Sequence, residues 1–132
     1  MLAHHALLEV ASQRSAAILR YKEQVDSTIE VVVYEVESLT IEDVRYLITL
    51  AYQTPGQYAS RSIVIAARVI NREAQHALLK VLEEPPKTTS FYIILPSIAS
   101  LLPTVLSRVI IVAGDTVGEN QYPLFGTFVE GT

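Results

Sequence analysis

The sequence of 132 residues contains no cysteine. This absence excludes disulfides, thiolate metal ligands and a cysteine nucleophile, and it suits a reducing compartment, so we expect the cytoplasm. No apolar run reaches the roughly 18 residues of a membrane span. The first residues, MLAHHALLEV, lack the basic start of a signal peptide. We therefore expect a soluble protein without a membrane segment.

Basic residues are few and scattered. Ten Lys and Arg stand against fourteen Asp and Glu, which gives a net charge of −4. A protein that binds nucleic acid on its own usually carries a basic patch that neutralises phosphates. We therefore expect contact with DNA only indirectly, through a complex. Hydrophobic residues make up 50% of the chain, which is enough for one domain with a buried core.

Apolar runs alternate with segments of helical period along most of the chain. Runs rich in β-branched residues predict strands, and stripes at spacings i, i+3, i+4 and i+7 predict amphipathic helices. Parallel strands need crossovers, which are usually helical, so the alternation predicts an α/β fold: an open parallel five-stranded sheet with helices on both faces. The predicted strands lie near residues 5–10, 28–36, 61–67, 90–96 and 108–112.

The last part of the chain lacks this pattern. The stretch GDTVGENQYPLFGTFVEGT has four glycines, one proline and no regular period. We interpret residues 1–113 as one α/β domain and residues 114–132 as a tail or docking segment.

One predicted helix ends in an unusual way. Asn71 is placed to cap its start, and Pro85 and Pro86 prevent it from continuing. Just before them, Glu83 and Glu84 put carboxylates at the negative end of the helix dipole, which costs about 0.3–1 kcal/mol each. Two interpretations stay open: Glu83 and Glu84 are simply solvated, or the Glu-Glu-Pro-Pro end is a partner-contact surface.

This region resembles a known family. The stretches AQHALLKVLEEPP, FYIIL and LLPTVLSR follow one another between residues 74 and 108. They resemble the second half of the ATPase core of clamp-loader subunits in the AAA+ superfamily; delta-prime subunits of the DNA polymerase III clamp loader are most similar, and gamma/tau subunits come next. The resemblance implies a P-loop NTPase core with strand order 5-1-4-3-2. It also implies a role in DNA replication, with clamp-loader ATPase subunits or other replication proteins as partners.

The parts that bind and hydrolyse ATP in this family are degenerate here. A phosphate-binding loop needs glycines and a Lys-Ser/Thr pair, but the turn after the first predicted strand has no glycine and keeps only Arg14-Ser15. Ile65 and Ala66 stand where acidic residues would hold Mg²⁺. We expect no cofactor, no metal and no enzymatic activity, with a vestigial nucleotide site at Arg14, Ser15, Ile65, Ala66 and Ser97.

The resemblance also implies one candidate functional pair. Ser107 and Arg108 match the Ser-Arg pair with which family members present an arginine to a nucleotide held by a neighbouring subunit. A guanidinium suits this role because it stays charged at neutral pH. An ordinary surface arginine, paired with a carboxylate or solvated, is the alternative. The family's helical lid and collar do not follow in this sequence, so the partner and the oligomeric state, a homo-oligomer included, stay open.

We therefore expect a non-catalytic, delta-prime-like interaction module that offers Arg108 in trans to a partner ATPase. Two alternatives stay open because a fold does not determine a function. One is an orphan α/β scaffold or regulatory domain. The other is a small NTP-dependent enzyme with an unconventional phosphate loop built on Arg14 and Ser15.

Overall fold

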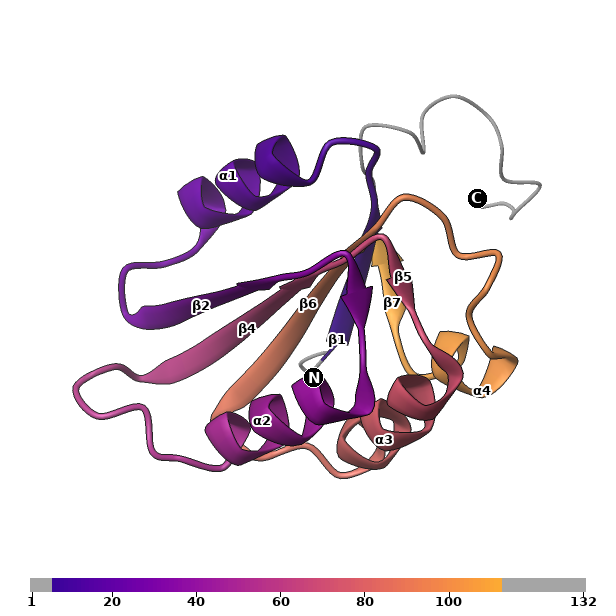
Figure 1. Cartoon of the computed structure of the whole chain (residues 1–132). Helices are drawn as coiled ribbons and strands as arrows, with labels where there is room; N and C mark the ends of the chain where they lie inside the picture. The colour runs from indigo at the N-terminus through magenta and orange to yellow at the C-terminus, as the bar shows by residue number, and fades with distance from the viewer. Residues whose placement is uncertain (1–5, 113–132) are drawn as a thin grey trace.

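The computed structural model describes residues 6–112, which form an open α/β sheet covered by helices on both faces (Figure 1). The five main strands are all parallel, in the order β2-β4-β6-β1-β7. Counted along the chain as strands one to five, this is the predicted order 5-1-4-3-2, so the fold is confirmed. The strands are β1 (Ala6–Val10), β2 (Ile29–Glu35), β4 (Ser60–Ala66), β6 (Thr89–Leu95) and β7 (Ile110–Val112).

The structure adds two short strands to the predicted set. β3 (Ser38–Leu39) and β5 (Val69–Ile70) pair in parallel as a separate two-stranded sheet. Each lies between a main strand and the cap of the next helix. Because two residues are too few to show an alternating pattern, the sequence carries no signal for them.

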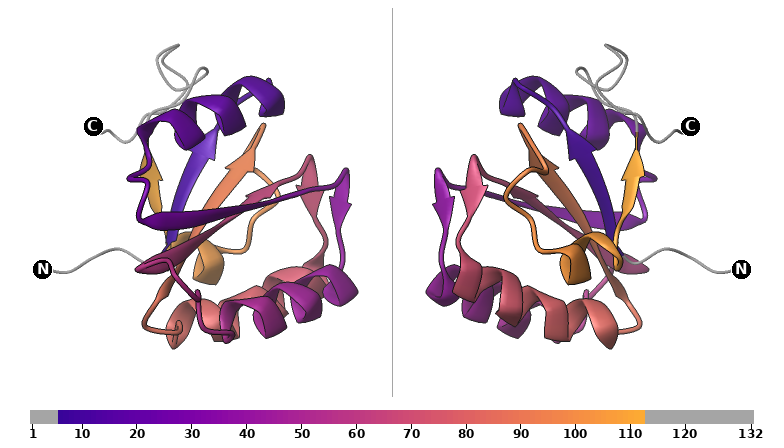
Figure 2. Two further views of the ribbon diagram at one scale, coloured as in Figure 1. Left: turned by 90° about the vertical axis from the view of Figure 1, so that its left-hand side faces the viewer. Right: turned by 90° about the vertical axis from the view of Figure 1, so that its right-hand side faces the viewer.

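Helices cover the two faces of the sheet unequally. α1 (Arg14–Gln24) lies on one face, whereas α2 (Ile41–Ala51) and α3 (Arg72–Glu83) lie on the other, with the short α4 (Pro103–Leu106) beside α3 (Figures 1 and 2). The cap predicted for α3 is confirmed, because Asn71 Oδ1 accepts a hydrogen bond from the Ala74 N–H at 2.9 Å. The helix ends at Glu83, shortly before the two prolines.

The larger hydrophobic core lies between the sheet and the layer of α2 and α3, and the smaller one lies beneath α1. Fully buried side chains of the larger core include Leu8, Leu47, Ile63, Leu78 and Phe91. The core beneath α1 contains mainly small or mixed side chains: Ala11, Ala17, Val64, Ala66, Tyr92 and Ile94. α1 itself buries only Ala17, so other contacts must help to hold it on the sheet.

A buried polar network supplies these contacts. Glu9 on β1 is 3% exposed; it accepts a hydrogen bond from Tyr92 Oη at 2.5 Å and another from Arg20 on α1. Tyr21 of α1 stacks on Tyr92 with ring centroids 3.9 Å apart, and its hydroxyl lies 2.7 Å from Ser62 Oγ. Burial and the hydrogen bond to Glu9 raise the pKa of Tyr92 far above its ordinary value. The network therefore anchors α1 through two tyrosines and one paired carboxylate.

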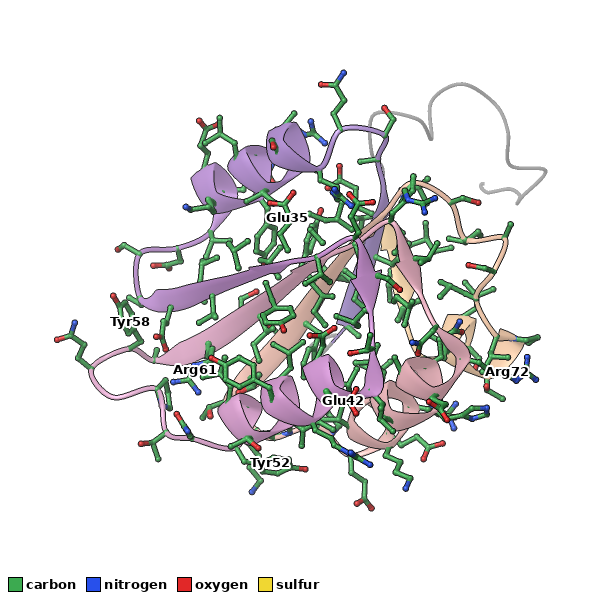
Figure 3. The ribbon with its side chains drawn as sticks, in the orientation of Figure 1. Glu35, Glu42, Tyr52, Tyr58, Arg61 and Arg72 are labelled. Atoms are coloured by element: carbon green, nitrogen blue, oxygen red, sulfur yellow. The ribbon has the colours of Figure 1, made fainter. Side chains whose placement is uncertain are left out.

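Arg61, at the start of β4, closes the carboxyl end of α2 (Figure 3). Its buried guanidinium donates hydrogen bonds of 2.7–3.2 Å to the carbonyl oxygens of Leu50, Gln53 and Thr54. Glu30 Oε1 accepts a further hydrogen bond from Arg61 Nε at 2.8 Å. Leu50 lies in the last turn of α2, and Gln53 and Thr54 follow the end of the helix, so this arginine ties the end of α2 and the turn after it to the start of β4.

Candidate functional site

A cleft of about 300 Å³ lies where β1, β2 and β6 end and α1 begins. In open α/β sheets, ligands bind at this carboxyl edge of the strands. Part of the predicted vestigial nucleotide site lines the cleft. The lining residues are Ala11, Ser12, Arg14, Ser15, Glu35, Arg68 and Pro96.

Ion pairs within the chain engage both arginines of the cleft. Arg14 Nη2 lies 2.7 Å from Glu37 Oε2, and Arg14 Nε lies 3.4 Å from Glu35 Oε2. Arg68 Nε donates a hydrogen bond of 3.2 Å to the other carboxylate oxygen of Glu37. Hydrogen bonds from Arg14 and Arg68 lower the pKa of Glu37, and the hydrogen bond to Glu37 raises that of Arg14. The positive charges of the two guanidinium groups equal the negative charges of the two carboxylates. These four side chains therefore have no net positive charge that would attract a phosphate.

The other predicted residues of the vestigial site do not face this cleft. Ile65 and Ala66, at the end of β4, are fully buried on opposite faces of the sheet, Ile65 in the larger core and Ala66 beneath α1. Neither side chain has an oxygen that could bind a cation. Ser97 is exposed, and its Oγ accepts a hydrogen bond from the Ala99 N–H at 3.0 Å. The neighbouring Pro96, rather than Ser97, lines the cleft.

Arg108 lies at the opposite edge of the sheet, where the strands begin. The predicted fifth strand starts two residues too early, because Ser107 caps the end of α4 and β7 begins only at Ile110. Ser107 Oγ donates a hydrogen bond to the Thr104 carbonyl at 2.8 Å, which closes the turn. The Arg108 side chain is 44% exposed and therefore accessible to another molecule.

Two predicted groups of site residues meet at Arg108. Its Nη2 lies 3.2 Å from Oε2 of Glu83, the last residue of α3. The guanidinium offsets the carboxylate at the negative end of the helix, so Glu83 is paired within the chain rather than simply solvated. Pro85 and Pro86 are half-buried just beyond. A hollow of about 590 Å³ at this place is lined by Lys80, Leu82, Glu83, Glu84 and Arg108.

The site residues predicted from the sequence did not include Glu35, Glu37 or Arg68. A usable signal was present, because Glu35 and Glu37 lie at the end of the second predicted strand and Arg68 directly follows the third. The carboxyl ends of neighbouring parallel strands lie at one edge of a sheet, so the predicted topology places these charged residues close together. No group of three or more His, Asp or Glu residues within residues 6–112 is suited to hold a metal ion.

Comparisons with known proteins first define the class. The fold is similar to that of a crystal structure of a DNA polymerase III gamma subunit-related protein from Thermotoga maritima, with a TM-score of 0.63 and 23% sequence identity. The match covers 82% of this chain and 40% of that one, so the chain spans less than half the length of this relative. The similarity therefore shows that the chain shares the α/β fold of this relative.

The family follows from the sequence itself. Residues 2–115 match the family described as DNA polymerase III, delta subunit, and the chain belongs to this family. The resemblance to DNA polymerase III clamp-loader subunits is thereby confirmed at the level of the family. No curated protein matches the sequence. Among the helices of residues 6–112, none has both the length and the apolar character needed to cross a membrane.

Proposed function

We propose that the chain is a non-catalytic interaction module of the DNA polymerase III clamp loader, of the delta-prime type. In this proposal it works in the cytoplasm, assembles with clamp-loader ATPase subunits and meets DNA only through the assembled complex. The observation that carries the proposal is the cleft at the carboxyl edge of the sheet, where ion pairs stand in place of a phosphate-binding loop.

Charge and backbone conformation both argue against nucleotide binding in this cleft. A phosphate-binding loop wraps phosphates with backbone N–H groups, and the positive φ angles that this requires favour glycine. The turn from β1 into α1 contains no glycine. Both basic side chains of the cleft are already paired: Arg14 contacts Glu35 and Glu37, and Arg68 contacts Glu37.

ATP hydrolysis by this chain would also need a bound metal ion, and the residues that would hold the metal are missing. Phosphoryl transfer depends on positioning and on the neutralisation of charge by a bound metal ion. Ile65 and Ala66, which align with the metal-binding acids of the family, are buried aliphatic side chains. The proposal therefore assigns ATP turnover to a partner and not to this chain.

Arg108 is the residue that we expect the partner to use. It lies on the edge opposite the cleft, so it faces away from the chain's own vestigial site. The Arg108–Glu83 ion pair is half-exposed, and such pairs contribute only about 0–1 kcal/mol. A γ-phosphate on a neighbouring subunit can therefore replace Glu83 at small cost, and a planar guanidinium suits that group.

Reconstitution with the DNA polymerase III ATPase and delta subunits of the same organism tests this function. We expect the chain to co-elute with the ATPase subunits in gel filtration and to raise their ATP turnover. The chain alone should show no turnover above a buffer control. If the chain stays apart from the ATPase subunits while hydrolysing ATP by itself, the alternative of a small NTP-dependent enzyme is correct.

A further inference from the structure

Glu37 does not line the cleft itself, but its carboxylate pairs with both arginines that do. Its Oε2 is 2.7 Å from Arg14 Nη2, and its Oε1 is 3.2 Å from Arg68 Nε, so each oxygen binds a different guanidinium. The two arginines come from separate parts of the fold, one from the start of α1 and the other from the segment between β4 and β5. A phosphate or sulfate that bridges two arginines uses the same pairing of oxygens with guanidinium groups.

The backbone fixes Glu37 in this position. Its carbonyl oxygen accepts hydrogen bonds from the N–H groups of Arg68 and Val69, at 3.0 and 3.1 Å. These bonds join the segment between β2 and β3 to the segment between β4 and β5. The Glu37 carboxylate is therefore presented to both guanidinium groups by the fold, although its side chain is 67% exposed.

We propose that Glu37 acts as an internal substitute for an external oxyanion. The cleft is then a latent polyphosphate site whose two arginines are occupied by the chain's own carboxylate. This inference deepens the proposed loss of nucleotide binding and rests on it. The missing glycine loop explains why phosphates would be wrapped poorly. The bridge that Glu37 forms between Arg14 and Arg68 explains why these two arginines do not bind phosphates even without such a loop.

The charges around the cleft agree with this inference. Neutralising Glu37 leaves two guanidinium groups, Arg14 and Arg68, with one carboxylate, Glu35, so this group of side chains gains a net positive charge. α1 begins at Arg14 with no acidic residue in its first turn, so the positive end of the helix adds to the attraction. Among residues 6–112, the ion pair of Glu35 is with Arg14, at 3.4 Å, so Glu35 does not join the two arginines.

Isothermal titration with inorganic tripolyphosphate at low ionic strength tests the inference. We expect no saturable heat for the wild-type chain and saturable binding for Glu37→Gln, at least about tenfold tighter than the limit set by wild type. Adding Arg14→Gln to the Glu37→Gln variant should abolish the binding. Thermal melts verify that the variants fold, and Glu37→Ala is a second variant should Glu37→Gln unfold.

Glu35→Gln is the matched control, because it changes the net charge equally and leaves the bridge intact. Like the wild-type chain, it should show no saturable heat with tripolyphosphate. Equal gains in Glu35→Gln and Glu37→Gln would reduce the effect to general charge and overturn the inference, as would the absence of binding in both Glu37 variants. Neither result bears on the proposed function, which fails instead if the wild-type chain binds ATP.

Discussion

The guanidinium of Arg108 lies 3.2 Å from the carboxylate of Glu83. In the free chain, the arginine that we propose to act on a neighbouring subunit is therefore held by the carboxyl end of α3. The pair joins the turn before β7 to the Glu-Glu-Pro-Pro end of the helix. Docking of a partner on this surface would both contact that end and release the arginine.

Replacing Arg108 by Ala tests its role in trans. We expect ATP turnover of the reconstituted complex to fall roughly a few-fold, because an arginine finger stabilises the transferring phosphoryl group and one subunit controls only a share of the total turnover. The stability of the chain should change by less than about 1 kcal/mol, since the ion pair is half-exposed. Arg72→Ala, at an exposed position on the first turn of α3 (Figure 3), is the matched control. Unchanged turnover in an intact complex would make Arg108 an ordinary surface residue.

Arg61 should contribute strongly to stability. Arg61→Met removes the donor for three carbonyl oxygens at the end of α2 and leaves Glu30 without its partner. Breaking a buried charge pair typically costs about 3–5 kcal/mol, and we expect the lower end because the Glu30 side chain is 32% exposed to water. Urea unfolding measures the change, with Arg45→Met, at an exposed position on α2, as the control. A loss no larger than that of the control would contradict the assigned role.

The hydroxyl of Tyr92 should matter for the network beneath α1. Tyr92→Phe leaves one oxygen of the buried Glu9 without its donor, and an unsatisfied buried acceptor costs about 1–3 kcal/mol. Tyr46→Phe removes the same hydroxyl from a side chain that is 57% exposed, and it should change stability by less than about 0.5 kcal/mol. Equal unfolding free energies for the two variants would show that the Glu9–Tyr92 hydrogen bond adds nothing.

Thr40 and Asp43 form a capping box at the start of α2, in which each side chain accepts a hydrogen bond from the backbone N–H of the other residue. This box predicts a loss of stability in acid. Burial acts to raise the pKa of Asp43, but hydrogen bonds from Tyr34 and Thr40 outweigh it and hold the pKa below the ordinary value of 3.8. A carboxyl with a lowered pKa in the folded state stabilises the fold above its ordinary pKa, and this contribution is lost as the pH falls toward the folded pKa. Urea unfolding between about pH 6 and about pH 2.5 should therefore show a smaller acid loss for Asp43→Asn than for wild type. Parallel curves would contradict the assignment.

Much of the fold could be predicted from the sequence because the strands of a covered parallel sheet are continuous apolar runs. Ile63 to Ala66 and Phe91 to Leu95 are buried on both faces, and such runs stand out between amphipathic helices. The α3 cap at Asn71 is a local signal as well. The strand order came from the resemblance to a family, since apolar runs alone do not say which strands are neighbours.

The charge pairs of the cleft could not be predicted in the same way. Glu37 lies 23 residues from Arg14 and 31 from Arg68 in the chain, so their contact depends on how β2, β4 and α1 are placed against each other. The burial of Arg61 could not be predicted from the sequence for a similar reason. A charged residue at the start of a strand is usually exposed, and only the position of the α2 end encloses it.

Calorimetric titration of the purified wild-type chain with ATP and Mg²⁺ measures whether this chain binds ATP. We predict no saturable heat up to about millimolar ATP, with a P-loop ATPase in the same buffer as the positive control. A saturable isotherm with a micromolar Kd would contradict the account, because the ion-paired cleft would then hold a nucleotide despite the missing glycine loop.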